Sequence, residues 1–184
     1  QLKTIEKTKL VSWWALDTNY TDSHGSNDGT NSGSTLTTSV YGGNAPVLPR
    51  AVDVAREGEA DAIGDGSALF NGTSDIISTA QFDDLFLGGA TMSAWIKPSS
   101  DGENSLGRIF DKSNHTTGND GPVLLVADES GGSCDLKFHH GHWSATGAWS
   151  TDAREVTIGE WNHVAVTGGG GGNDEIGDLL YKGG

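Results

Sequence analysis

Oxygen-bearing side chains gather in one polar loop of the sequence, between Asp17 and Thr30. Asp17, Asp22, Asn27 and Asp28 lie there among glycine and serine residues, directly after an apolar segment. Hard oxygen ligands in a flexible loop suit calcium, which takes about 6–8 oxygens, so we predict a calcium site on these four residues. The loop lacks the D-x-[DN]-x-[DN]-G spacing of a strong calcium motif, and Asx residues also bond their own backbone in ordinary turns. Both interpretations stay open.

Histidine and tryptophan residues form a second group, near position 140. His140 and His142 are two residues apart, which places them on one face of a strand if the strand continues, and Trp143 and Trp149 follow. A polar and aromatic surface suits a sugar or protein ligand. We therefore predict ligand binding at these four residues, with a plain solvated hairpin as the alternative.

Carboxylates arranged for glycosidic bond cleavage are scarce. Glu57 and Glu59 have the alternate spacing of a pair on a strand, and Asp174 and Glu175 lie beside a run of glycines. A retaining glycosidase needs two carboxyl groups about 5–5.5 Å apart, in a cleft that separates their pKa values. Neither set has the apolar surroundings of such a cleft, so we predict no catalytic residues and no enzyme activity.

The single cysteine, Cys134, shares a face with Leu136 and Phe138 if the segment is a strand. This pattern predicts a buried structural thiol, and not a nucleophile activated by His139.

The charge of the chain excludes several classes of partner. Its 184 residues carry a formal net charge of −14, whereas nucleic acids and anionic membrane surfaces require basic patches. No apolar run is long enough to span a bilayer. We therefore expect no nucleic acid partner and no membrane insertion.

Short apolar stretches separated by Gly, Ser, Asn and Asp predict an all-β fold. Tryptophans 13, 95 and 161 fall within such stretches, and we expect their large side chains in the core. The predicted strands are Leu10–Leu16, Ser67–Ser78 (two strands about an Asn71-Gly72 turn), Ala90–Pro98, Gly107–Lys112, Pro122–Ala127, Asp135–His140, Glu155–Ile158, Trp161–Thr167 and Asp178–Lys182. Residues 1–9, which are polar and basic, are expected to form an N-terminal arm or linker, and residues 10–184 one domain.

Four segments together resemble the laminin-G-like, concanavalin A-like lectin/glucanase superfamily. They are LVSWWALD at Leu10–Asp17, ALFNGTSDIIS at Ala68–Ser78, ATMSAWIKP at Ala90–Pro98 and GEWNHVAVT at Gly159–Thr167. The loop Asp22–Thr30 resembles the D-S-x-G-x-x-D-G-T loop of the same family. The resemblance implies an antiparallel two-sheet β-sandwich of the jelly roll type, and many such modules hold calcium in their loops.

The C-terminal part departs from this pattern. Glycines 168–172 replace the usual Tyr-Asp-Gly turn, and several later strands of the family are lacking. We therefore expect a sandwich that is incomplete at its C-terminal end, with an open sheet edge that another chain or a following segment would complete.

Lectins, hydrolases and adhesive modules share this fold, and since no carboxylate pair suits catalysis, our first hypothesis is a non-catalytic binding or structural module. The segment GGNAPVLPRAVDVAREGEADAIGDGSALF also resembles phage-type structural proteins. We expect a decoration or tail-associated protein on a virion or other extracellular surface, in contact with other copies or a neighbouring structural protein, and with host glycans. A carbohydrate-binding domain of a secreted bacterial enzyme or adhesin is the alternative, and a glycoside hydrolase is the third hypothesis.

Overall fold

The computed structural model describes residues 10–16, 18–37, 66–80, 90–112, 122–139, 148–151, 153–168 and 181–183. These fall into two compact units, one within residues 1–81 and one within residues 82–184. The described residues form antiparallel strands and a single 3₁₀ turn at Glu103–Ser105, with no α-helix among them. The predicted all-β class is therefore confirmed.

The first unit consists of two short strand pairs. β1 (Thr30–Ser32) pairs with β4 (Ile76–Ser78), and β2 (Thr35–Thr37) pairs with β3 (Ser67–Leu69). The predicted strand–turn–strand at Ser67–Ser78 is present as β3 and β4, but these strands pair with β2 and β1 and not with each other. Asn71 explains the wide turn, because its Oδ1 accepts the backbone N–H groups of Thr73, Ser74 and Asp75.

The prediction of a first strand at Leu10–Leu16 is wrong. No strand is assigned there, and the segment is half-buried or exposed along its length. Its backbone bonds to the following loop instead: Trp13 N–H donates to Asp22, and its carbonyl accepts Ser23 N–H at 2.7 Å. Leu16 then turns into the left-handed region, with φ 57°, which ends the extended segment.

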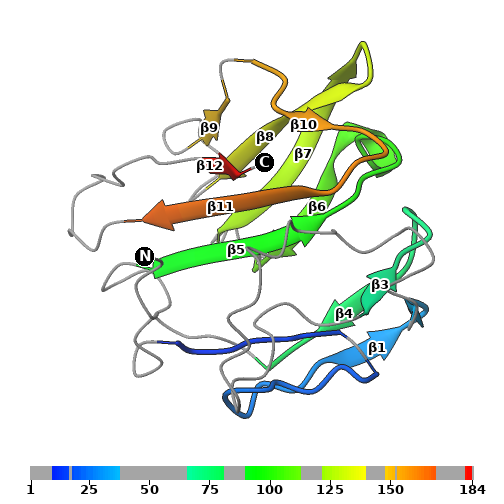
Figure 1. Cartoon of the computed structure of the whole chain (residues 1–184), viewed down its shortest axis with the longest axis vertical. Coiled ribbons are helices and arrows are strands. Elements are labelled where there is room, and N and C mark those ends of the chain that lie inside the picture. Colours follow the sequence, from blue (N-terminus) through cyan, green and yellow to red (C-terminus); the bar gives the residue numbers. More distant parts are fainter. Residues whose placement is uncertain are drawn as a thin grey trace, which may run out of the picture. The chain divides into compact units, whose positions relative to one another are not determined.

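The second unit is a two-sheet β-sandwich (Figure 1). One sheet has the order β12-β11-β5, in which the long central pairing joins β11 to β5 over seven residues. The other has the order β10-β8-β7-β6, with β9 paired to β8. The bounds are β5 Ala90–Ile96, β6 Gly107–Asp111, β7 Val123–Ser130, β8 Ser133–His139, β9 Ala148–Ser150, β10 Val156–Thr157, β11 Asn162–Gly168 and β12 Tyr181–Gly183.

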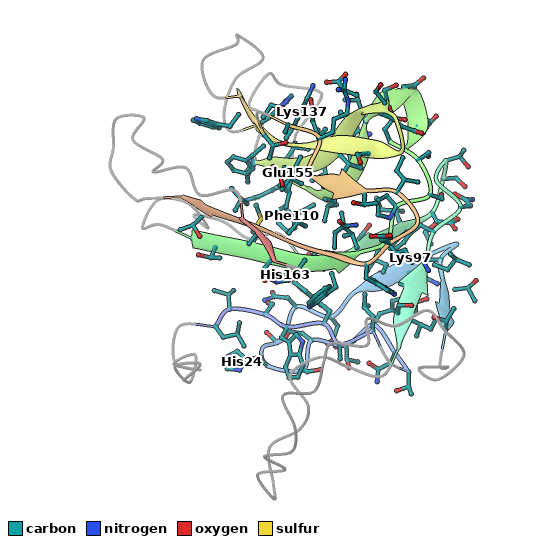
Figure 2. All side chains as sticks on the ribbon, turned by 45° about the horizontal axis from the view of Figure 1, so that its top comes forward. His24, Lys97, Phe110, Lys137, Glu155 and His163 are labelled. Carbon is teal, nitrogen blue, oxygen red and sulfur yellow. The ribbon has the colours of Figure 1, made fainter. Side chains whose placement is uncertain are left out.

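The core lies between these two sheets, because alternate residues of each strand point into the gap. Figure 2 shows Phe110 in this gap. The buried cluster consists of Leu124, Val126, Cys134, Leu136, Phe138, Val156, Val164 and Val166, and Met92, Ala94 and Ile96 of β5 pack against it.

The prediction that three tryptophans fill the core is wrong, because Trp13, Trp95 and Trp161 are each only half-buried. Trp95 alternates with Ala94 and Ile96, which face the core, so its indole lies on the opposite face of the sheet.

Candidate functional site

Asp22 is at the centre of the loop for which we predicted calcium. It is one of the few buried polar residues among those described, at 8% exposure. Its Oδ1 accepts the backbone N–H groups of Trp13, His24 and Gly25 at 3.0, 3.0 and 2.9 Å, and its Oδ2 accepts that of Asn27 at 3.1 Å. Both carboxylate oxygens therefore bind the backbone of the loop.

The neighbouring predicted ligands belong to the same network. Asp28 Oδ1 accepts the backbone N–H of Asp22 at 2.9 Å. Asn27 Nδ2 donates to Ser12 Oγ at 2.7 Å, and the Asn27 carbonyl accepts the indole N–H of Trp14 at 2.9 Å. Three of the four predicted ligands are thus brought together, and they join the loop to the segment before it.

The charge state of Asp22 follows from these contacts. Burial by itself raises the pKa of a carboxyl group, but the backbone hydrogen bonds from Gly25, Trp13 and His24 outweigh it and hold the pKa of Asp22 well below its usual range. Within the part of the chain that the structure describes, no group of three or more His, Cys, Asp or Glu side chains is placed to hold a metal ion. Calcium stays a prediction, and Asp17 lies outside the described residues.

The predicted histidine and tryptophan surface is only partly described. His140, His142 and Trp143 lie outside the described residues. Trp149 lies on β9, and its ring stacks on Phe138, with centroids 5.9 Å apart and ring planes 27° apart. Since Phe138 belongs to the buried cluster, Trp149 packs on the core with at least part of its surface. Glu57, Glu59, Asp174 and Glu175 also lie outside the described residues.

The prediction for Cys134 is confirmed, since the residue is fully buried. Burial, and then the nearby carboxylates of Asp101, Glu129 and Asp135, raise the pKa of its thiol. A thiol with a raised pKa holds little thiolate at neutral pH and is a poor nucleophile.

Sequence reasoning missed one group of side chains, on the face of β5 and β11 that points away from the core. There Trp95 of β5 lies directly opposite His163 of β11. Their ring centroids are 5.1 Å apart and their planes are tilted by 44°. Strand alternation could have predicted this face from the sequence. Trp95 is next to Ala94 and His163 is next to Val164, so each ring lies on the face opposite to its small or aliphatic neighbour.

A row of hydroxyl groups continues the same face along the two strands. Thr91 and Thr167 are directly opposite one another, and their Oγ1 atoms are 3.0 Å apart. Ser93 lies between Thr91 and Trp95 on the same face, and its partner across the sheet is the small residue Ala165. Thr91, Ser93 and Thr167 are exposed. We call Thr91, Ser93, Trp95, His163, Ala165 and Thr167 the β5–β11 face.

The dimensions and chemistry of the β5–β11 face suit a short saccharide. Thr91 and Trp95 are four residues apart, or about 13 Å along an extended strand. An aromatic ring offers a flat apolar surface for the C–H face of a sugar. Hydroxyl groups both donate and accept hydrogen bonds, as sugar hydroxyl groups do.

Burial lowers the pKa of His163 and so favours the neutral imidazole, which has one donor and one acceptor nitrogen. His163 lies between two buried residues of β11, Asn162 and Val164. The strand therefore fixes its position on the face.

Comparison with known proteins gives one match. No curated protein and no solved structure matches the chain. In the described residues, no helix has the length and apolar character needed to cross a membrane. A family model described as the concanavalin A-like lectin/glucanases superfamily matches residues 71–176, a range that contains both Trp95 and His163. This match covers more than half of the sequence and agrees with the antiparallel sandwich, and the chain therefore belongs to the concanavalin A-like lectin/glucanase superfamily.

Proposed function

We propose that the protein is a non-catalytic carbohydrate-binding module whose sugar site is the β5–β11 face. The superfamily includes lectins, which makes saccharides the first class of ligand to consider. One observation carries the choice of site: Trp95 and His163 lie together on the face that points away from the core, beside a row of exposed hydroxyl groups.

The described carboxyl groups support binding without hydrolysis. The general acid of a glycosidase has a raised carboxyl pKa, which keeps it protonated until it meets its substrate. Asp22, the one buried carboxylate of the described residues, has its pKa shifted in the opposite direction. The pKa of Asp128 is also lowered, by its hydrogen bond and charge interaction with Lys137.

The biological setting is a further part of this proposal. The resemblance of residues 42–70 to phage-type structural proteins favours a module on a virion, either on the capsid or near the tail, where it would contact host glycans and neighbouring copies. A carbohydrate-binding domain of a secreted bacterial enzyme or adhesin would use the same face in the same way. Both settings are extracellular.

A glycan array probed with the full chain tests the proposal. We expect binding to one or more saccharides, a loss of about tenfold or more in affinity for Trp95→Ala, and no release of reducing ends. Phe70→Ala is the matched control, because Phe70 is a 45% exposed aromatic residue of the other unit. Circular dichroism would show that both variants fold. Binding unaffected by Trp95→Ala, or hydrolysis of a bound glycan, would overturn the proposal.

A further inference from the structure

His163 is the member of the β5–β11 face whose charge is able to change near neutral pH. Its register partner on β12 is Gly183, which has no side chain, and Trp95 is its partner on β5. Titratable residue types at nearby positions of the described elements are Lys97, directly after β5, and two residues of β12, Tyr181 opposite Ala165 and Lys182 opposite Val164. Lysine and tyrosine do not ordinarily change charge between about pH 5 and 8, whereas histidine does.

We propose that the β5–β11 face selects neutral saccharides, with His163 as an uncharged hydrogen-bonding partner, and that acidification releases them. This inference rests on the proposed carbohydrate-binding function and adds the class of ligand and its regulation. It makes His163 a specificity-determining residue of the site.

The charge of the protein and the chemistry of the face both favour a neutral ligand. Three exposed hydroxyl side chains line the face beside Trp95. The chain as a whole carries a formal net charge of −14, which repels uronic acids, sialic acids and sulfated sugars. A neutral pyranose meets no such repulsion, and it covers Trp95 without burying an unpaired charge.

The pH dependence follows from the burial of His163. Partial burial already favours the neutral imidazole and lowers its pKa. A saccharide seated on Trp95 would remove more water from the adjacent imidazole, so the complex favours the neutral form more strongly than the free protein does. Protonated His163 must then release its proton on binding. Affinity is therefore highest above the pKa of free His163, and falls by up to about tenfold for each pH unit below it.

Titration calorimetry on the full chain tests this inference. The neutral probes are laminarihexaose, cellohexaose and mannohexaose, and the anionic probes are hexagalacturonate and a chondroitin sulfate hexasaccharide. We expect at least one neutral probe to bind at about pH 7.5 and to lose about tenfold in affinity at about pH 5. His163→Gln, which keeps a donor and an acceptor but does not titrate, should bind that probe with little dependence on pH.

His139→Gln is the matched control. The pKa of His139 is also lowered, by desolvation and then by the charge of Lys137. His139 is exposed on β8, in the other sheet, so its replacement should leave the pH dependence of binding unchanged. Equal affinity at both pH values, or preference for an anionic probe, would overturn the inference while leaving the proposed function standing. If no saccharide binds, or if Trp95→Ala leaves the affinity unchanged, both the inference and the proposed function would be overturned.

Discussion

Asn162 bonds through its side chain to both backbone groups of Thr157. The Thr157 N–H donates to Asn162 Oδ1 at 3.1 Å, and Asn162 Nδ2 donates to the Thr157 carbonyl at 2.9 Å and to the Glu160 carbonyl at 2.8 Å. The residue is 2% exposed. It therefore closes the turn from β10 into β11 and fixes the start of the strand that carries His163.

Replacement of Asn162 by alanine should destabilise the fold. Asn162→Ala leaves the N–H and carbonyl of the half-buried Thr157 without these partners, which costs about 1–3 kcal/mol in the free energy of unfolding. Chemical denaturation would measure the loss, with Glu160→Ala as the control because Glu160 is exposed and takes part through its carbonyl. Equal stability of the two variants would show that the side-chain bonds of Asn162 contribute little.

Replacement of Asp22 by asparagine should lower stability at neutral pH and flatten its acid dependence. The folded-state pKa of Asp22 lies below the unfolded value of about 3.8. Its contribution is therefore complete above that value and is lost as the pH falls through the lower, folded-state pKa. We expect Asp22→Asn to lose about 2–3 kcal/mol at pH 7, measured by denaturation at a series of pH values. Glu155→Gln, at an exposed carboxyl group, is the control. A variant whose stability declines in acid as steeply as the parent would contradict this role.

The longer strands of the second unit were predictable because period-two burial leaves a direct mark on the sequence. β8 shows this best: Cys134, Leu136 and Phe138 are buried and face the core, while the residues between them are more exposed. The apolar run of β7 also predicted a strand, and Val123, Leu125 and Ala127 form a second buried cluster beside the main core.

The position of the tryptophans was harder to predict, because size and alternation gave opposite answers. The large volume of the indole favoured a place in the core for Trp95. Alternation along the strand instead placed Trp95 on the other face of the sheet from its neighbours Ala94 and Ile96. Alternation proved correct, since Leu124, Phe138 and Val164 fill the space between the sheets. The role of Asp22 could not be read from the sequence at all. The side-chain oxygens of an Asx-rich loop bind either a cation or the N–H groups of the loop backbone. Which of the two occurs depends on the direction in which the backbone N–H groups between Trp13 and Asn27 point.

Gly102→Ala should be poorly tolerated for two independent reasons. Gly102 has φ 83°, and an added Cβ would lie against the backbone of Gly107, 2.7 Å from its nitrogen. We expect a loss of at least about 2 kcal/mol in the free energy of unfolding. Gly131→Ala is the matched control, because φ is 63° there but nothing lies within 4 Å of the added atom, so only the backbone cost of about 1 kcal/mol remains. If both variants lose the same amount, the close approach to Gly107 does not matter.

The thiol of Cys134 should not react in the native protein. It is fully buried, and its pKa is raised. We expect no labelling by a thiol-specific chromogenic reagent at neutral pH, and labelling of one thiol per chain once denaturant unfolds the protein, because the sequence contains a single cysteine. Rapid labelling under native conditions would mean that this part of the core opens readily.

The central claim is that the β5–β11 face binds saccharide, and an NMR titration of the isotopically labelled full chain with the neutral hexasaccharides tests it most directly. We predict that the largest shift changes fall on the Trp95 indole N–H, the His163 ring and the amides of Thr91, Ser93 and Thr167, with smaller changes elsewhere. Saccharide-dependent changes centred on the opposite sheet, at Lys137 and His139 of β8, would contradict the account, and so would an unchanged spectrum.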